Sequence, residues 1–370
     1  MICRRAGWLA ATLILAVGTL RADPVDEAVA AQMETRHIPG LSLAVIQKGR
    51  IVREQGYGFR DVERHLPVTA DTVFQAASVS KPVAALGALR LVADGRLHLD
   101  EDINRVLRSW QIPANGFTRR HPVTLRLILG HRAGLTLQGF SPGYRPGTAV
   151  PALPQLLDGQ PPANNVPVRV DQAPGAAFRY SGGGYTVMQQ AMDDVTGEAF
   201  AGYMARTVLR PLGMTASTFA LEVPVPASGR ERLATGYTGS KPRPLVGGAD
   251  LYPAAAAAGL WTTAGDLARF YLGVQKALAG DPEAILAPGL ARLMVTDQGG
   301  SHGLAFFVGG TPARFGHNGW HEGFCAVTVA FESGEGVMIL MNSDPDVDAV
   351  ADTLVRAVGR QYRWPGYPPP

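Results

Sequence analysis

Cysteine is nearly absent from this chain, which has only Cys3 and Cys325 among its 370 residues. Removal of an N-terminal segment would leave one thiol, which excludes an internal disulfide in the processed chain. Cys325 lies in the apolar stretch GFCAVTVAF, which is typical of a strand. We therefore predict a buried and unreactive thiol at this position, not a nucleophile.

Charge is also scarce, and its distribution excludes two classes of partner. Charged residues make up 18% of the chain and hydrophobic residues 46%, which is typical of a globular protein. Of the 34 basic residues, three arginines lie within the first 22 residues, which contain no acidic residue. The remaining 31 basic residues equal the 31 acidic ones in number. Without its first 22 residues the chain has no formal net charge, which gives no electrostatic basis for binding nucleic acid or an anionic membrane.

No apolar run reaches the roughly 20 residues that a membrane-spanning helix requires. The N-terminal run, about residues 8–20, is shorter and follows two arginines, as in a secretory signal. We expect residues 1–22 to be a signal peptide and the protein to be periplasmic or secreted, without stable membrane insertion after cleavage. Cleavage after Gly18 places small residues better than cleavage after Ala22, and an uncleaved anchor is the alternative.

Apolar periodicity predicts strands near both ends of the chain and helices between them. A hairpin is expected over residues 40–58, with its turn at Lys48-Gly49-Arg50. Further strands are expected between residues 302 and 342, separated by Gly-Gly, Asn-Gly and Ser-Gly-Glu-Gly turns. Helices are expected over residues 78–95, over 185–196 before the stop residue Gly197, after the cap Thr263, and over 347–362.

This order of elements predicts an α+β fold. Both chain ends form one antiparallel sheet flanked by helices, and a mainly helical region of about residues 96–250 is inserted between them. The segment 139–178 is rich in Pro and Gly and is expected to be a long loop that lines a functional site. The catalytic domain is expected to cover residues 23–362 and to be followed by a tail, 363–370.

Ser78 and Lys81 form the single Ser-x-x-Lys sequence in the chain. Residues three apart share one face of a helix, so the amine can reach the serine oxygen. A serine hydroxyl is a poor nucleophile until a base removes its proton, and a lysine can act as that base when its pKa is lowered. Burial and the positive end of a helix both lower the pKa of a lysine. The alternative is a serine that caps the helix beside a solvated lysine.

Two further motifs follow in order, and together with the first they resemble the serine β-lactamase and penicillin-binding-protein family. The similarity is greatest to its class C β-lactamase and esterase branch. FRYSGGGY places Tyr180 at the tyrosine of the second motif, and FGHNGW places His317-Asn318-Gly319 at the Lys-Thr-Gly position. The stretches LILGHRAGL and AAGLWTTAGDLARF also look like family segments, and the resemblance covers roughly residues 25–345.

The resemblance implies a β-lactamase/transpeptidase-like fold and a role for each motif residue. Ser78 would form an acyl-enzyme with a lactam, a peptide-like amide or an ester, and water would release the acid. Lys81 would accept the serine proton, with Tyr180 as an alternative or cooperating base. The backbone N–H groups of Ser78 and Trp320 would form the oxyanion hole. No metal or organic cofactor is implied, and the partner is a small-molecule or peptide-like substrate.

Two positions depart from the family pattern. Gly182 stands where the family often has asparagine, and His317 replaces the lysine of the third motif. The first change removes a donor to the substrate amide, and the second weakens the hold on a substrate carboxylate. Both changes are tolerable in an esterase or a peptidase, and a carboxylesterase without lactam activity is one alternative. A penicillin-binding sensor that is acylated without turnover is another.

Other histidines suggest weaker alternatives. His317 and His321 are four apart, as in a helical zinc site, but the intervening Asn-Gly predicts a turn and disfavours zinc. His131 is expected to fix a loop. Of the two tryptophans near the motifs, Trp261 and Trp320, we expect only Trp320 to line the substrate groove.

Overall fold

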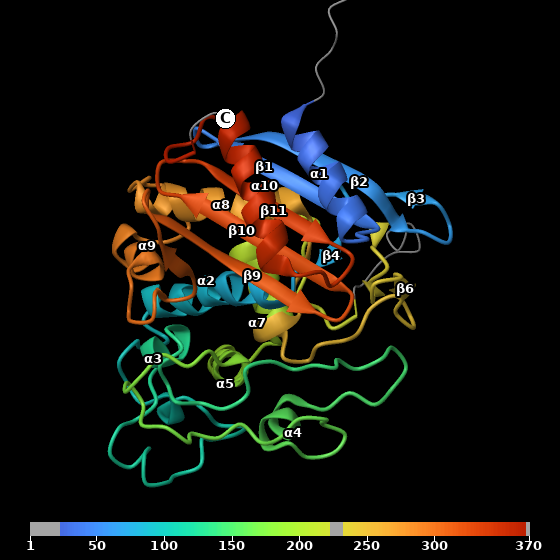
Figure 1. Ribbon diagram of the computed structural model, residues 1–370. Helices are drawn as coiled ribbons and strands as arrows, with labels where there is room; N and C mark the ends of the chain where they lie inside the picture. Colours follow the sequence, from blue (N-terminus) through green and yellow to red (C-terminus); the bar gives the residue numbers. More distant parts are fainter. Residues whose placement is uncertain (1–22, 223–231, 368–370) are drawn as a thin grey trace, which may run out of the picture.

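Strands from both ends of the chain lie side by side in one antiparallel sheet (Figure 1). The computed structural model describes residues 23–222 and 232–367. The sheet has seven strands in the order β3-β2-β1-β11-β10-β9-β8, and the central pair joins Leu41 of β1 to Met341 of β11. The strands are β1 (Gly40–Gln47), β2 (Arg50–Asp61), β3 (Leu66–Pro67), β8 (Phe307–Gly309), β9 (Arg314–His321), β10 (Phe324–Phe331) and β11 (Gly336–Met341).

Helices cover both faces of this sheet. Helices α1 (Pro24–Thr35) and α10 (Val347–Gln361) pack on the outer face, where an apolar cluster includes Val29, Val327 and Leu354. Helix α8 (Ala264–Leu278) packs on the inner face. Cys325 is buried in the outer layer, and burial raises the pKa of its thiol well above the usual value. The prediction of a buried, unreactive cysteine is therefore consistent with its surroundings.

Helix α2 (Ser80–Ala93) lies between the sheet and a lower lobe built from short helices and long loops (Figure 1). It is apolar nearly all round, and eleven of its fourteen residues are buried. The lobe contains the loop expected over 139–178, although α4 interrupts it. The other helices are η1 (Ala77–Val79), η2 (Ile103–Arg105), α3 (Leu125–Leu129), α4 (Leu153–Asp158), α5 (Gly182–Thr196), α6 (Phe200–Met204), η3 (Ala205–Leu209), α7 (Ala255–Ala258) and α9 (Pro288–Val295).

Two small sheets complete the fold. In the first, β4 (Phe74–Gln75) pairs with β7 (Trp261–Thr262), and this joins the segment before Ser78 to the segment before α8. In the second, β5 (Tyr237–Thr238) pairs with β6 (Arg243–Pro244).

Most of the predicted elements are present, with one error that bears on the site. The hairpin turn at Lys48-Gly49 is confirmed, and both residues have the positive φ that such a turn requires. The helices over 78–95, 185–196 and 347–362 are confirmed to within a few residues. The Asn-Gly turn is wrong, because β9 continues through Asn318-Gly319 and the chain turns at Glu322-Gly323. Pairing with β10 holds the dipeptide in the strand.

Two predictions concern the ends of the chain. The predicted signal peptide lies outside the described residues. Within the described part of the chain, no helix has both the length and the apolar character needed to span a membrane. Of the predicted tail, Trp364 is buried and its indole Nε1 donates to Oε1 of Gln47 over 2.7 Å.

Candidate active site

Ser78 lies in a tight turn that the surrounding backbone holds in place. The turn is η1, which directly precedes α2, and Ala77 has a φ of 46°, a left-handed conformation that is uncommon for alanine. The hydroxyl of Ser80 donates to the Ala77 carbonyl over 2.6 Å and accepts from the N–H of Leu260 over 2.9 Å. These bonds hold the turn and thereby fix the direction of the Ser78 side chain.

Lys81 lies one turn further on and is buried beside Ser78. Its Nζ is 3.0 Å from Oγ of Ser78 and 2.8 Å from the carbonyl oxygen of Ala257, and the residue is only 2% exposed. Burial lowers the pKa of Lys81 to about 7. A neutral amine that donates one hydrogen bond to the Ala257 carbonyl can direct its lone pair toward the serine hydroxyl. The geometry therefore permits proton transfer from Ser78 to Lys81 near neutral pH.

Tyr180 covers the other side of the amine. Its ring centroid lies 4.9 Å from Nζ of Lys81, and its hydroxyl oxygen lies 3.5 Å from Nε2 of His317. Burial raises the pKa of Tyr180 well above its usual value, although a hydrogen bond with Ser78 offsets part of this rise. The phenol is therefore protonated at neutral pH, which favours Lys81 over Tyr180 as the base and leaves Tyr180 as a proton donor or relay.

The loop before α5 places Tyr180, and His131 holds that loop. Ser181 caps α5, and its hydroxyl accepts from the N–H of Gly184 over 2.9 Å. The backbone N–H of Ser181 donates to Nδ1 of His131 over 3.0 Å. The imidazole of His131 also packs against the Tyr180 ring, with centroids 4.2 Å apart. These contacts support the expected loop-fixing role of His131.

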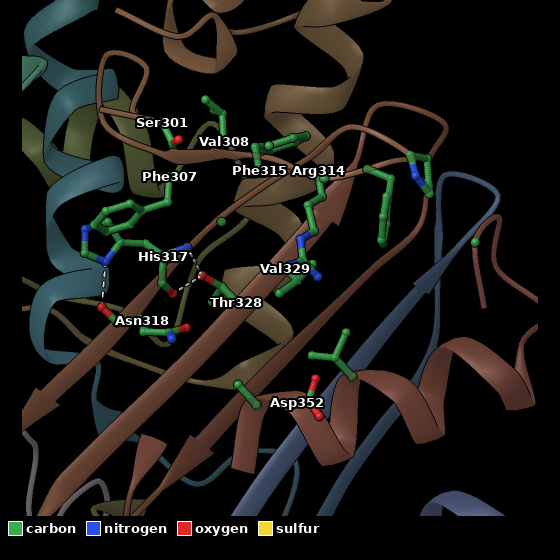
Figure 2. Close-up of a pocket in the computed structure, with 18 of the residues that line it drawn as sticks. Ser301, Phe307, Val308, Arg314, Phe315, His317, Asn318, Thr328, Val329 and Asp352 are labelled. Atoms are coloured by element: carbon green, nitrogen blue, oxygen red, sulfur yellow. Dashed lines mark hydrogen bonds between the residues drawn. The ribbon is translucent and has the colours of Figure 1, made fainter. Parts of the chain in front are cut away.

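His317 enters the site from β9 as a neutral imidazole. Its Nδ1 donates to the carbonyl oxygen of Asn318 over 2.6 Å, so the lone pair of Nε2 faces the hydroxyl of Tyr180. Burial, and then the charges of Lys81 and His302, lower the pKa of His317 well below its usual value. The hydroxyl of Thr328 bonds to both the N–H and the carbonyl of His317 (Figure 2). The imidazole is thus fixed in place and carries no positive charge.

Alternation along β9 separates the residues of the third motif. His317, Gly319 and His321 face the interior, and a Cβ on Gly319 would lie 3.1 Å from the backbone nitrogen of Ser78. The side chain of Asn318 points to the opposite face and donates to Asp348 over 3.0 Å. Trp320 lies on that face too and is 49% exposed. Two-residue alternation thus turns the side chains of Asn318 and Trp320 to the face opposite His317 and Gly319, and the expectation that they line the site stays a prediction.

Comparison with protein-family models identifies the family of this chain. The model of the Beta-lactamase family matches residues 25–360. The chain belongs to the β-lactamase family.

Relatives within the β-lactamase family differ in their named activities. Esterase EstB of Burkholderia gladioli is 31% identical over 222 residues, which are 58% of this chain and 54% of EstB. Protein flp of Staphylococcus aureus (strain N315) is 24% identical over 197 residues, 53% of this chain and 38% of flp. The chain therefore spans about half of EstB and about two fifths of flp in these matches. 

One solved structure shows how widely the fold is shared. The D-amino acid amidase from Ochrobactrum anthropi SV3 has a TM-score of 0.72 and 22% identity to this chain. The match covers 90% of this chain and 98% of the amidase. This similarity shows a common fold, as the sequence predicted, namely the β-lactamase/transpeptidase-like α+β architecture.

Within this β-lactamase-family site, a side chain at Gly182 would be crowded in the present backbone position. Gly182 is the first residue of α5, and a Cβ there would lie 3.0 Å from the carbonyl oxygen of Gln138. The loop that contains Gln138 would therefore have to shift slightly to admit a side chain. The second motif supplies the Tyr180 hydroxyl but no amide group.

Sequence reasoning missed two groups near Lys81 and His317. The Ala257 carbonyl contacts Lys81 but is a backbone atom, so no side-chain motif marks it. Phe307 lies on the short edge strand β8, with its ring centroid 5.1 Å from that of His317. A phenylalanine in an apolar strand segment carries no signal that separates a core residue from a site residue.

A cavity of about 940 Å³ lies beside Phe307 and His317. Phe307 and His317 line one end, whereas Arg314 and Asp352 line the other, between β9 and α10 (Figure 2). Ser78 is not among its lining residues. No group of three or more His, Cys, Asp or Glu residues that could hold a metal ion occurs in the described ranges. The zinc alternative for His317 and His321 thus has no third ligand there.

Proposed function

We propose that this protein is a serine hydrolase that forms an acyl-enzyme on Ser78 and acts on carboxylic esters. The contact between Lys81 and Ser78 carries the proposal, because a buried amine 3.0 Å from a serine oxygen is poised as a base. Membership of the β-lactamase family agrees with it. A periplasmic or secreted location is part of the proposal on the N-terminal sequence alone.

In the first step, neutral Lys81 takes the hydroxyl proton of Ser78 as Oγ attacks the ester carbonyl carbon. The negative charge that develops on the carbonyl oxygen is stabilised by the backbone N–H groups of Ser78 and Trp320, each contributing about 3 kcal/mol. Tyr180 donates its proton to the departing alcohol oxygen, and the proton on Lys81 replaces it. Water then attacks the acyl-enzyme by the reverse sequence of proton transfers and releases the acid and Ser78.

The choice of an ester rests on what the site lacks. His317 is neutral and bonded to its own strand, so it offers no cation to a substrate carboxylate. Gly182 offers no amide to a substrate amide group. The relative EstB is named an esterase, which agrees with this choice. Lactams and D-amino acid peptides usually carry the carboxylate that this site does not accommodate.

Three probes on the purified protein test the proposal: a fluorophosphonate, a fluorescent penicillin and 4-nitrophenyl butyrate, with adducts located by mass. We expect a phosphonyl adduct on Ser78, turnover of the butyrate and no stable penicillin adduct. A stable penicillin adduct without ester turnover would identify the sensor alternative. Failure of every probe to label Ser78 would contradict a serine hydrolase. Cys325→Ala is the control and should label normally, because that thiol is buried.

The pH dependence of turnover should follow Lys81. Because Lys81 must be neutral to act as a base and its pKa is about 7, kcat/KM should rise with pH, with a midpoint near pH 7. Below this pH the amine is protonated, and the rate should fall about tenfold per pH unit. The measurement uses an ester without ionisable groups between pH 5 and 9. A flat profile across this range would rule out Lys81 as the base.

A further inference from the structure

Phe307 is a large apolar side chain that is left partly open to solvent beside the active site. It belongs to the edge strand β8 and is 41% exposed. Its ring lies nearly parallel to that of Tyr180, with an interplanar angle of 11° and centroids 6.2 Å apart. It also packs on His317 at 5.1 Å. An exposed aromatic ring in contact with two active-site residues suggests a surface for substrate.

The ring is held from behind and leaves its other side free. His302 meets it edge-on at 4.8 Å, and Phe178 meets it at 6.4 Å. Strand β8 pairs with β9 only as far as Gly316. Among the residues that the structure describes, no strand pairs with this edge of β9 from His317 onward. Phe307 is therefore the last side chain of the sheet edge before the open part of the site. A ring that is already ordered loses little conformational entropy when a ligand packs on it.

The position of Phe307 relative to Tyr180 determines which part of the substrate it meets. In the proposed reaction, Tyr180 gives its proton to the departing alcohol oxygen. The alcohol part of the ester must therefore leave on the side of Tyr180, which is the side where Phe307 lies.

The side chains that contact Phe307 would not stabilise a negatively charged leaving group. His317 is neutral. The arginines that adjoin His131 and Tyr180 in the chain bond elsewhere: Arg132 donates to the carbonyls of Gln298 and Gly175, and Arg179 pairs with Asp171. Arg314 lies at the far end of the cavity and points toward Asp352 (Figure 2). A carboxylate on the alcohol part would lie against an apolar ring whose histidine neighbours, His302 and His317, are neutral at pH 7, at a desolvation cost.

We propose that Phe307 binds the leaving group and makes the enzyme select esters of apolar, uncharged alcohols, preferably aromatic ones. The inference rests on the proposed ester hydrolysis at Ser78. It adds a residue that determines specificity and that belongs to none of the three motifs.

The test compares kcat/KM for benzyl butyrate, methyl butyrate and 4-carboxybenzyl butyrate. These esters share one acyl group, so ratios between them report on the leaving group alone. Phe307→Ala should lower the benzyl-to-methyl ratio about tenfold, because one aromatic contact of about 1.4 kcal/mol is lost. Phe307→Tyr keeps the ring and should keep most of the ratio. Phe307→Lys should shift preference toward the 4-carboxybenzyl ester by a similar factor.

Phe59→Ala is the matched control. Phe59 is also 41% exposed, but it lies on β2, which three strands separate from β9, so its removal should leave the ratios unchanged. An unchanged benzyl-to-methyl ratio in Phe307→Ala, with Ser78 still labelled by a fluorophosphonate, would overturn this inference and leave the hydrolase standing. Absence of label and of turnover in the wild type would overturn both.

Discussion

Replacing Lys81 with methionine will lower turnover about 10³- to 10⁴-fold, close to the residual rate of Ser78→Ala. Methionine has a similar length but no proton acceptor, so the hydroxyl 3.0 Å from the present amine loses its base. Residues that act as one unit show non-additive losses, so the double variant should be hardly slower than either single variant. Single-turnover acylation by 4-nitrophenyl butyrate measures the effect. Acylation within tenfold of the wild-type rate would exclude Lys81 as the base.

The same variant should be more stable than the wild type, since Lys81 is buried and its charged form is costly there. The pKa of Lys81 is about 7 when folded and near 10.5 when unfolded, so between these values the unfolded chain binds one more proton. Wild-type stability therefore rises from pH 7 by about 1.4 kcal/mol per pH unit. The advantage of Lys81→Met, about 1–4 kcal/mol, should be greatest below pH 7 and shrink above it.

Denaturant unfolding at pH 6 and pH 9 measures this difference. Lys276→Met is the control, because Lys276 is exposed on α8 and its replacement should change neither stability nor turnover. A stability gain that is equal at both pH values would show that burial does not lower the pKa of Lys81. A less stable Lys81→Met would show that the bond to the Ala257 carbonyl outweighs the cost of burial.

The part of the site that is local in sequence could be predicted. Ser78 and Lys81 are three residues apart, and helix geometry alone brings them together. The burial of Lys81 follows from the segment around it, which is apolar on every side and must lie inside the protein. The three motifs occur in the order that the β-lactamase family has. This order predicted that Tyr180 and His317 lie near this pair, although about 100 and 240 residues separate them from Ser78.

Features set by tertiary contacts could not be predicted. Asn318-Gly319 favours a turn locally, but pairing with β10 on one side and contact with η1 on the inner face keep it extended. The protonation of His317 depends on its bond to the Asn318 carbonyl and on its burial, neither of which a residue name conveys. Phe307 reaches the site only because β8 ends where the open edge of β9 begins.

These tertiary contacts change how the family pattern is interpreted. A lysine in the third motif would bring a second cation close to Lys81, whereas neutral His317 does not. The lowered pKa of Lys81 is caused by burial, so the amine can be a base without a neighbouring cation. Under the proposed function, the site lacks a carboxylate anchor but keeps Lys81 as its base, so both departures are compatible with ester hydrolysis.

Adding one methyl group to Gly319 will reduce acylation of Ser78 at least about 100-fold. In Gly319→Ala the new Cβ would lie 2.3 Å from the Ala76 carbonyl oxygen and 3.1 Å from the Ser78 nitrogen. Backbone atoms cannot move aside as a flexible side chain does, so β9 and η1 must separate. This displaces Ser78 relative to Trp320, whose N–H groups form the proposed oxyanion hole, and small displacements of that kind cost about 10²-fold.

Loss of folding must be distinguished from loss of the site, and Gly56→Ala provides that comparison. Its Cβ would lie 2.4 Å from the Val68 carbonyl oxygen, a nearly equal clash on β2, far from Ser78. Both variants should lose about 1–3 kcal/mol of stability. Only Gly319→Ala should lose fluorophosphonate labelling per folded molecule. Equal labelling rates in the two folded variants would show that close contact between β9 and η1 is not needed for acylation, and the oxyanion hole would then lie elsewhere.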